Sequence, residues 1–313
     1  MIHIIVNPAG AGGRTKRLWT KLEPLLGDAG YEVHYTREGQ TAGDIAASLT
    51  GPGEGTVDLV ILGGDGTMNE LVNGIRDFSR TRVGLIPSGS ANDLAKSLDL
   101  SKKPEELLSS ILEGKTLRML DVGQVLAKKA DGSSFLKRFV ESAGLGFDAA
   151  VCAEVASSRL KKVFNRLSIG KLIYLFVAAR LIFRSETVPA VLDLYQKGGE
   201  KKQLQLQRMN FAAIMNNPYE GGGFYFCPNA ESSDGILDLC AVHDLKTLEF
   251  FRFFPRALTG KHVSIKTRIE IAQAEKIQIQ AKEPLWLHFD GETDTKVKEA
   301  VISLTGEKLQ LLV

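Results

Sequence analysis

The chain has 313 residues and a formal net charge of only +2, because its 39 lysines and arginines nearly balance its 37 aspartates and glutamates. So small a net charge argues against a nucleic acid or another polyanion as a partner. The length favours two domains, and a hydrophobic fraction of 44% fits a globular protein with a substantial core.

Short apolar runs alternate with segments of helical spacing over residues 1–120. The runs predict strands at Ile2–Val6, Tyr31–Tyr35, Val57–Leu62 and Arg82–Ile86, and the segments between and after them predict helices at Thr15–Leu26, Thr41–Leu49, Thr67–Ile75, Ala91–Leu98 and Pro104–Glu113. Thr41 and Asp44 have the spacing of a capping box at the start of the second helix. The alternation predicts a doubly wound α/β domain, which is a parallel sheet covered by helices on both faces.

Strand-like runs dominate from about Leu117 onward. They predict strands at Leu117–Leu126, Phe135–Ser142, Val188–Tyr195, Gln203–Met209, Phe211–Met215, Ile236–Val242, Lys276–Ala281 and Leu285–Phe289, with helices near Ala149–Leu160, Ser168–Phe183 and Lys246–Leu258. We therefore expect a second, β-rich domain with a mainly antiparallel sheet, either a sandwich or a partly closed barrel. The tail, Glu299–Val313, could form one more hairpin in either domain.

Three loops follow strands of the first domain, at the edge where open α/β sheets bind ligands. The first loop is rich in small residues and contains Asn7, Pro8, Ala9, Gly10 and Ala11. A glycine-rich stretch at a helix start is a ready anion site. Thr15 stands where a dinucleotide-binding fingerprint needs its last glycine, so the loop departs from the Rossmann pattern and disfavours a dehydrogenase. A flexible turn explains this loop equally well.

The second loop, Gly63-Gly64-Asp65-Gly66-Thr67-Met68-Asn69-Glu70, joins an apolar run to a helix. Its glycines let a ligand approach the backbone closely. Asp65 is well placed to hold Mg²⁺ on a nucleotide, because hard cations prefer carboxylate oxygen. Thr67 and Glu70 also have capping-box spacing, so a structural turn is the alternative. A cap alone does not account for three glycines beside an aspartate, which favours phosphate binding.

Two further motifs are ambiguous when each is taken alone. The third loop follows the fourth predicted strand, and its Ser90 and Asp93 could form a plain capping box. Asp290, Gly291 and Glu292 follow a late strand, and Asp-Gly is by itself more typical of a hairpin turn.

Six motifs occur in an order that resembles the bacterial soluble diacylglycerol kinases, a family related to the sphingosine kinases. They are Gly63-Gly64-Asp65-Gly66-Thr67-x-Asn69-Glu70, Gly89-Ser90-Ala91-Asn92-Asp93, Glu141-x-x-Gly144-x-Gly146-Phe147-Asp148, Asn217-x-x-x-Gly221-Gly222-Gly223, Pro228-x-Ala230-x-x-x-Asp234-Gly235-x-Leu237-Asp238 and Asp290-Gly291-Glu292. The resemblance covers essentially the whole chain. One departure is Ser90, which stands where the family usually has threonine and retains the hydroxyl.

The resemblance implies an α/β nucleotide-binding domain at 1–120 and a β-rich lipid-substrate domain at 121–299. It also implies an active site in the cleft between them and a tail, about 300–313, that returns to the first domain. The implied reaction is transfer of the γ-phosphoryl group of ATP to the hydroxyl of a lipid alcohol, with diacylglycerol as the expected acceptor. Such a transfer asks a protein mainly for positioning and charge neutralisation.

The resemblance also implies ATP and Mg²⁺ as cofactors and assigns residues to them. The ATP-binding positions are Asn7, Pro8, Ala9, Gly10, Ala11, Thr36, Gly64, Asp65, Gly66, Thr67, Met68, Asn69 and Glu70. Asp290 matches the general base on the lipid hydroxyl. Glu231, Asp234 and Ile236 match a structural Mg²⁺ site, in which Asp234 offers its carboxylate and the other two offer backbone carbonyls.

Two alternatives stay open. NAD kinases and phosphofructokinases also carry Gly-Gly-Asp-Gly, so another small-molecule kinase on this scaffold is the first. A non-catalytic lipid- or nucleotide-binding protein is the second. The Asn92-Asp93 pair and the late Asp290-Gly291-Glu292 favour the lipid kinase.

A lipid kinase must touch a membrane, and two segments have the composition of interfacial helices. Residues 159–185 hold seven basic side chains and no acidic one, interleaved with apolar and aromatic residues. The second segment is Phe250–His262. Both could instead be ordinary helices with solvated basic edges.

The remaining features concern location. The N-terminal run lacks the basic region of a signal peptide. Cys152, Cys227 and Cys240 have neither disulfide-framework nor zinc spacing. We therefore expect a cytoplasmic protein that is peripheral to the inner face of the cell membrane through transient contact with anionic lipid, and a homodimer is left open.

Overall fold

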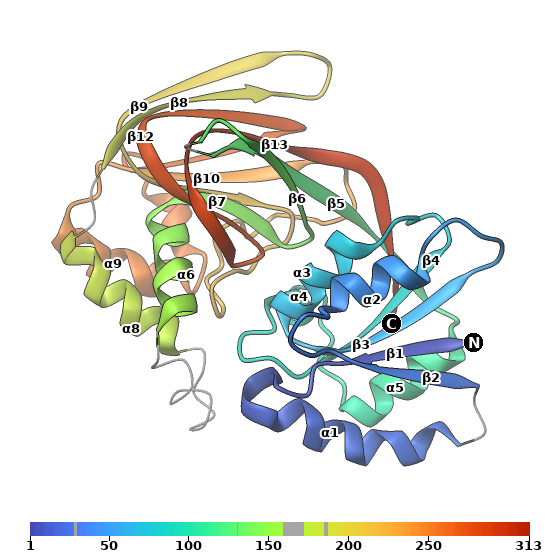
Figure 1. Ribbon diagram of the computed structural model, residues 1–313. Helices are drawn as coiled ribbons and strands as arrows, with labels where there is room; N and C mark the ends of the chain where they lie inside the picture. Colours follow the sequence, from blue (N-terminus) through green and yellow to red (C-terminus); the bar gives the residue numbers. More distant parts are fainter. Residues whose placement is uncertain (28–29, 130, 159–171, 185–186) are drawn as a thin grey trace.

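The computed structural model describes residues 1–27, 30–129, 131–158, 172–184 and 187–313. Its strands form one continuous hydrogen-bonded sheet of 13 strands. An α/β unit occupies one end of this sheet and a β-rich unit the other (Figure 1). The predicted fold class is thereby confirmed, whereas the exact domain limits stay a prediction.

The N-terminal unit is built on four parallel strands. They are β1 (Ile2–Val6), β2 (Tyr31–Tyr35), β3 (Val57–Gly63) and β4 (Thr81–Pro87), and they lie in the order β4-β3-β1-β2. β3 is buried along nearly its whole length, as expected for a strand with both faces covered. Every loop at the carboxyl ends of these strands therefore opens toward the same edge.

Helices cover both faces of this parallel sheet. On one face, α1 (Arg14–Leu22), η2 (Glu23–Leu26) and α5 (Pro104–Glu113) pack Trp19, Leu22 and Ile111 against Ile4 and Val60. On the other face lie α2 (Ala42–Leu49), α3 (Asp65–Gly74) and α4 (Asp93–Ser97), which contribute Ile45, Met68 and Leu94 to a second core. The predicted capping box is confirmed, because Thr41 and Asp44 exchange both bonds at the start of α2.

The C-terminal unit consists of longer, antiparallel strands. They are β5 (Leu117–Lys128), β6 (Ser134–Phe139), β7 (Ser142–Gly146), β8 (Val188–Tyr195), β9 (Lys201–Met215), β10 (Leu237–His243), β11 (Ile269–Ala274), β12 (Lys276–Phe289) and β13 (Glu292–Leu312). Val125, Leu192, Leu239 and Ile302 come from four different strands and join one buried cluster, so the sheet curls around its own core.

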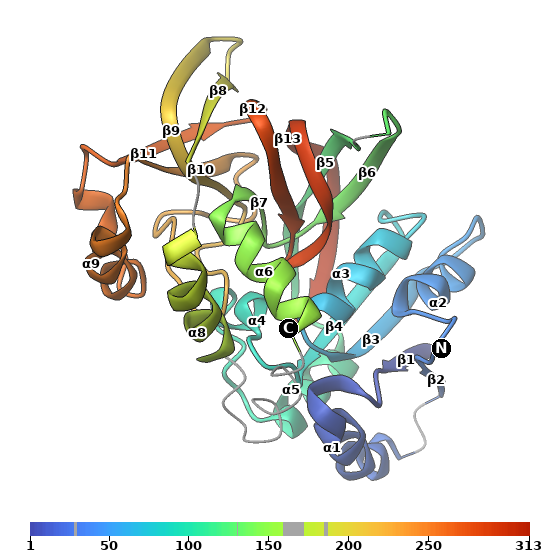
Figure 2. The same cartoon turned by 60° about the vertical axis from the view of Figure 1, so that its left-hand side comes forward.

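Three helices lie against the outside of this curled sheet, side by side (Figure 2). They are α6 (Phe147–Ser157), α8 (Leu172–Leu181), which continues into η3 (Ile182–Arg184), and α9 (Thr247–Ala257), which is followed by η4 (Lys261–Ser264). Phe147, Val177 and Phe253 bring these helices into a third core with Phe211 of β9. Of the basic segment at 159–185, residues 159–171 and 185 lie outside the described residues. No helix among the described residues combines the length and apolarity needed to cross a bilayer.

β13 connects the two units. It pairs antiparallel with β12 and β5, and its last residues, Gln310–Leu312, run parallel to β4. The expected hairpin at Glu299–Val313 is therefore wrong, because the segment is the second half of one 21-residue strand. The pattern looks broken because the register shifts between Leu304 and Lys308, around Gly306 with its φ of +84°.

Candidate active site

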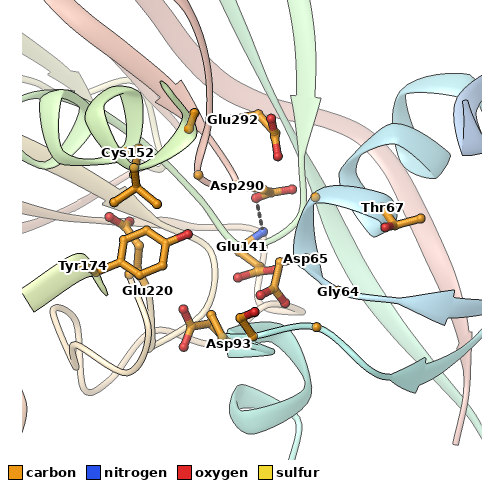
Figure 3. A pocket seen from close by; sticks show the side chains of 18 of the residues that line it. Gly64, Asp65, Thr67, Asp93, Glu141, Cys152, Tyr174, Glu220, Asp290 and Glu292 are labelled. Atoms are coloured by element: carbon orange, nitrogen blue, oxygen red, sulfur yellow. Dashed lines mark hydrogen bonds between the residues drawn. The ribbon is translucent and has the colours of Figure 1, made fainter. Parts of the chain in front are cut away.

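A cavity of about 200 Å³ lies between the two units, at the carboxyl ends of β1, β3 and β4. Its walls come from both units, as predicted for the active site (Figure 3). The lining residues of the α/β unit are Gly10, Ala11, Gly64, Asp65, Gly66, Thr67, Gly89, Ser90, Ala91 and Asp93. Those of the β-rich unit include Glu141, Tyr174, Glu220, Asp290 and Glu292.

The glycine loops approach one another closely at this cavity. A Cβ on Gly89 would lie only 2.5 Å from the Cα of Gly64, so a side chain there would push the two loops apart. Gly10 and Ala11 belong to η1 (Gly10–Gly13), whose Ala11 adopts a φ of +47°. Of the thirteen predicted ATP-binding positions, six line the cavity. The other seven do not: Asn7, Pro8, Ala9, Thr36, Met68, Asn69 and Glu70.

Thr67 and Glu70 do not form the expected capping box. Helix α3 begins at Asp65, and no side chain caps it. Thr67 Oγ1 instead accepts a hydrogen bond from Asn7 Nδ2 at 3.0 Å, which ties the first loop to the second. Glu70 Oε2 accepts one from the backbone N–H of Ala42 at 3.1 Å and so caps α2. The helix starts at Asp65, two residues earlier than predicted, directly after the glycines. Thr67 therefore lies inside the first turn and not at the cap position.

The plain capping box suggested for Ser90 and Asp93 is not formed either. Helix α4 starts at Asp93 after Asn92, which has a φ of +54° and makes no capping bond with its side chain. Asp93 Oδ2 accepts a hydrogen bond from the backbone N–H of Gly222, in the β-rich unit, at 2.7 Å. Asp93 therefore links the two sides of the cavity.

Asp65, Asp93 and Glu141 form a carboxylate cluster, with one oxygen of each within 4.8 Å of the others (Figure 3). Burial, followed by the charges of Asp65, Asp290 and Asp93, raises the pKa of Glu141 well above its ordinary value. Burial also raises the pKa of Asp65, against hydrogen bonds from Glu141 and from three backbone amides at the start of α4. The cluster thus brings three carboxyl groups together at the wall of the cavity.

This cluster fits a divalent cation. Glu141 Oε1 is buried and has no hydrogen-bond partner in the part of the chain that the structure describes. None of the described residues lining the cavity is basic. Three carboxylates from separate elements are the oxygen ligands that Mg²⁺ prefers. The sequence drew attention to Asp65 but not to Glu141 and Asp93 as its neighbours.

Asp290 lies on the turn between β12 and β13, with a φ of +48°. Its Oδ1 accepts hydrogen bonds from the backbone amides of Glu141 at 2.8 Å and Ser142 at 3.1 Å. Its Oδ2 accepts from the amide of Val140 at 3.0 Å and from Asn69 Nδ2 at 2.9 Å. Burial raises the pKa of Asp290 to about 6 against these bonds. Because Asn69 belongs to α3, Asp290 fastens the β-rich unit to this helix of the α/β unit.

Glu292 is the second carboxylate of the same turn. A carboxylate has about four lone-pair positions, and Asp290 already receives four donors, so one donor must move before Asp290 accepts a further proton. Glu292 is exposed, lines the same cavity, and places its Oε1 beside Gly66. The role of Asp290 as general base therefore stays a prediction. Glu292, its neighbour in the same turn, is a second candidate for the proton acceptor.

A buried charged triad lies next to this turn, around His288 near the end of β12. Sequence reasoning missed it. His288 Nε2 lies 3.3 Å from Asp148 Oδ2 and 3.4 Å from Glu220 Oε1, and all three residues are buried. Burial lowers the pKa of His288, but the charge of Glu220 and the bonds with both carboxylates outweigh it and raise the pKa to about 10. A Cβ on Gly144 would collide with the triad. The triad thus fixes β12 just before Asp290.

An apolar pocket of about 40 Å³ adjoins the acidic cavity. Both share Cys152, Tyr174, Glu220 and Gly221 as lining residues. The remaining walls are mostly aromatic and aliphatic: Phe147, Val151, Ala178, Phe211, Phe224, Phe226 and Phe254, together with Asp148.

The loop predicted to hold a structural Mg²⁺ lies away from this cavity. Asp234 is exposed, and its Oδ1 accepts a hydrogen bond from the backbone N–H of Ile236 at 2.9 Å. Glu231 is also exposed. The loop is attached to β5 by the N–H of Gly235, which donates to Asp121 Oδ2 at 3.0 Å. This geometry leaves the site a prediction.

Comparison with known proteins gives two family matches. Residues 1–125 match the diacylglycerol kinase catalytic domain, and residues 141–313 match the YegS C-terminal NAD kinase beta sandwich-like domain. A diacylglycerol kinase of Bacillus subtilis is 28% identical over 295 residues, covering 93% of this chain and 89% of that protein. A probable lipid kinase, YegS-like, of Xanthomonas euvesicatoria is 28% identical and covers 77% and 74%.

Solved structures show the same fold. A diacylglycerol kinase structure from Bacillus anthracis superimposes with a TM-score of 0.69 at 20% identity, covering 99% of this chain and 96% of that one. The yeast NADH kinase complexed with NADH gives a TM-score of 0.53 at 11% identity, covering 100% and 83%. The architecture is therefore shared with both lipid kinases and NAD kinases.

Proposed function

Because the chain belongs to the family that joins a diacylglycerol kinase catalytic domain to a YegS-type C-terminal domain, we propose that it transfers the γ-phosphoryl group of ATP to the hydroxyl of diacylglycerol. Family membership supports a lipid kinase that uses ATP. The choice of diacylglycerol rests on the names of relatives at 28% identity or less, and it is part of the proposal.

One observation carries the proposal: an acidic cavity lined by glycine loops adjoins an apolar pocket, and the two share lining residues. Loop amides and a bound cation suit phosphate, whereas a pocket walled by phenylalanines suits the start of an acyl chain. At about 40 Å³ this pocket admits a longer chain only if the aromatic side chains move apart. A nicotinamide dinucleotide offers no comparable apolar group, so this pairing favours the lipid branch over the NAD kinase alternative.

We assign the phosphate side of the cavity to the α/β unit. The loops at Gly10–Ala11 and Gly64–Thr67 would hold the ATP phosphates through backbone amides, and Asn7 would keep the loops together through Thr67. Asp65, Asp93 and Glu141 would hold Mg²⁺, which supplies neutralisation of phosphate charge when it is bound. Thr36 is outside the cavity lining and would act at most on the far end of the nucleotide.

The proton acceptor would come from the turn at Asp290–Glu292. Asp290, with a pKa of about 6, would be ionised at neutral pH and able to take the proton of the lipid hydroxyl once one of its donors moves. If Glu292 takes the proton instead, Asp290 keeps the role of holding the turn against Asn69.

Membrane contact would use the outer face of α8, η3 and α9. Large apolar side chains are exposed there, among them Phe176 at 50%, Phe183 at 68%, Leu248 at 75% and Phe251 at 48%. The rings of Phe183 and Phe251 lie tilted against each other with centroids 6.2 Å apart, which joins the helices into one patch. Exposed aromatic residues near Arg180, Arg252 and Arg256 suit an anionic lipid surface.

The assignment of the base is tested with Asp290→Asn and Glu292→Gln, each isosteric with the residue it replaces. Phosphoryl transfer from ATP to diacylglycerol in mixed micelles is measured together with nucleotide binding. Loss of transfer by Asp290→Asn, with ATP binding retained and Glu292→Gln active, would support Asp290. The reverse pattern would move the role to Glu292, and full activity in both variants would refute a base in this turn.

A further inference from the structure

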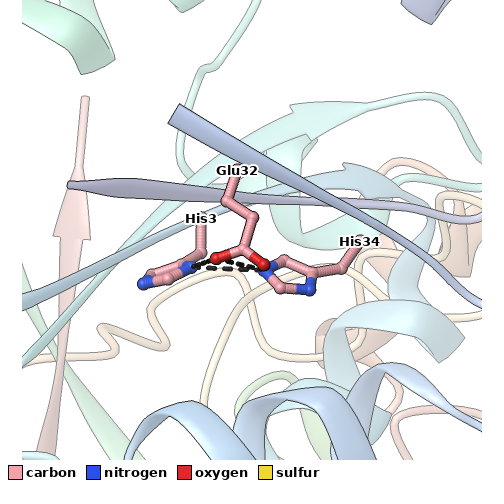
Figure 4. A group of neighbouring side chains, drawn as sticks. All are labelled: His3, Glu32 and His34. Atoms are coloured by element: carbon pink, nitrogen blue, oxygen red, sulfur yellow. Dashed lines mark hydrogen bonds and ion pairs between the residues drawn. The ribbon is translucent and has the colours of Figure 1, made fainter. Parts of the chain in front are cut away.

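Two histidines and a glutamate meet on β1 and β2, beside the edge of the α/β sheet (Figure 4). His3 lies on β1, and Glu32 and His34 lie on β2, which is the edge strand. Glu32 and His34 are two residues apart on one strand, so their side chains share a face of the sheet. The register pairs His3 with Glu32, which brings the third side chain beside them.

The three donor atoms form a compact triangle. His3 Nδ1 lies 3.2 Å from His34 Nε2 and 3.5 Å from Glu32 Oε2, and His34 Nε2 lies 3.8 Å from Glu32 Oε2. A tetrahedral Zn²⁺ with bonds of about 2.0–2.2 Å to imidazole and carboxylate requires ligand atoms about 3.3–3.6 Å apart. The edges of 3.2 and 3.8 Å lie about 0.1 and 0.2 Å outside this range, so the triangle is close to one face of a zinc tetrahedron.

The exposure of these side chains also suits a metal site. The histidine side chains are 16% and 19% exposed and Glu32 is 56% exposed, so the rings are held in place while solvent reaches the group. A simple His3–His34 hydrogen bond would account for one edge of the triangle but not for the carboxylate that completes it.

We propose that His3, Glu32 and His34 bind a divalent transition-metal ion of the zinc class, which clamps the edge strand β2 to β1. Imidazole nitrogen with a carboxylate is a donor set that such ions prefer over Mg²⁺. The site is separate from the cavity, and it does not depend on the proposed kinase activity.

The test is calorimetric titration of untagged protein, with Zn²⁺ as the titrant. The buffer contains excess Mg²⁺, so that sites made only of oxygen ligands are already filled. Wild type should bind one more Zn²⁺ than His34→Gln and Glu32→Gln, or bind it at least about tenfold more tightly. Even the removal of a residue that only supports a metal ligand lowers metal affinity about tenfold or more. His243→Gln is the matched control. His243 pairs with Asp244 and belongs to no group of three potential ligands among the described residues, so this variant should bind like wild type.

A second measurement separates metal binding from misfolding. Zn²⁺ should raise the melting temperature of wild type and of His243→Gln but leave His34→Gln unchanged. With EDTA present, all three proteins should melt at similar temperatures, which shows that His34→Gln is folded. Equal Zn²⁺ affinity and stoichiometry in wild type, Glu32→Gln and His34→Gln would overturn the proposal, as would a wild-type melting temperature that does not respond to Zn²⁺.

Discussion

At the scale of residues, the main features of the cavity are its carboxylates. Asp65, Asp93 and Glu141 lie close together, and one oxygen of Glu141 has no hydrogen-bond partner among the described residues. Asp290 instead accepts hydrogen bonds from four donors and holds the two units together. The same chemical group is therefore placed in two ways, once in the cluster that we propose to bind a cation and once in a turn that it holds in place.

Asp65→Asn should weaken the use of MgATP. The amide keeps the size of the side chain but removes a charged oxygen ligand, so we expect kcat/KM for MgATP to fall at least roughly tenfold. Asp99→Asn is the control, because Asp99 is exposed and its φ of +53° suits asparagine. The phosphate-loop assignment fails if Asp65→Asn retains the ATP and Mg²⁺ dependence of wild type.

Asp238 gives a prediction on pH that is independent of the cavity. Burial raises its pKa to about 6, partly offset by a hydrogen bond from Gln273. An acid whose pKa is higher in the folded state lowers the free energy of unfolding as pH rises from about 4 through about 6. Asp238→Asn should therefore gain about 1–3 kcal/mol at pH 8 and little at pH 4, measured by urea unfolding.

Asp193→Asn is the matched control for this prediction. Hydrogen bonds from Gln203 and Lys201 lower the pKa of Asp193, so its replacement removes a favourable charge and should not stabilise the protein at pH 8. Equal gains in both variants would mean that lost surface charge, and not the burial of Asp238, explains the effect.

At the scale of elements, α2 and α3 are pressed together at glycines. A Cβ on Gly74 would lie 2.0 Å from the backbone oxygen of Gly43, and one on Gly43 would lie 2.7 Å from that of Glu70. Because Glu70 also caps α2, this contact sets the direction of α3 and so of the loop Gly63–Asp65 at its start, which we propose to bind phosphate.

Gly74→Ala should lower the free energy of unfolding by about 2 kcal/mol or more, because backbone and not a flexible side chain blocks the methyl group. Gly51→Ala, where a Cβ would meet nothing within 4 Å, should change it little. Thermal and urea unfolding of both variants measure this, and equal stability would contradict the close contact.

Local patterns predicted most of these elements, and tertiary contacts account for the errors. Thr41 and Asp44 form their capping box because both bonds are local. Thr67 and Glu70 have the same spacing, but their side chains accept hydrogen bonds from Asn7 and Ala42 instead. The carboxylate cluster could not be read from sequence, because only the fold brings its members together.

At the scale of the whole molecule, β13 makes two units into one. Its end runs beside β4, and Leu309 and Leu311 are fully buried in the core of the α/β unit. The same strand begins beside Asp290, so the cavity and the junction between the units share one element.

Leu311→Ala should cost about 2–5 kcal/mol of unfolding free energy by opening a cavity where the units join. Leu136→Ala on β6, where the side chain is 52% exposed, should cost far less. Chemical denaturation of the pair checks this. A small, equal effect would contradict a joint core at β13.

The central claim is that this chain phosphorylates a lipid alcohol with ATP. The most direct measurement incubates the protein with γ-labelled ATP, Mg²⁺, a panel of lipid alcohols in mixed micelles and, separately, NAD, and then identifies the labelled product. We predict label in phosphatidic acid from diacylglycerol and none in NADP. Label in NADP, or no labelled lipid from any member of the panel, would contradict the account.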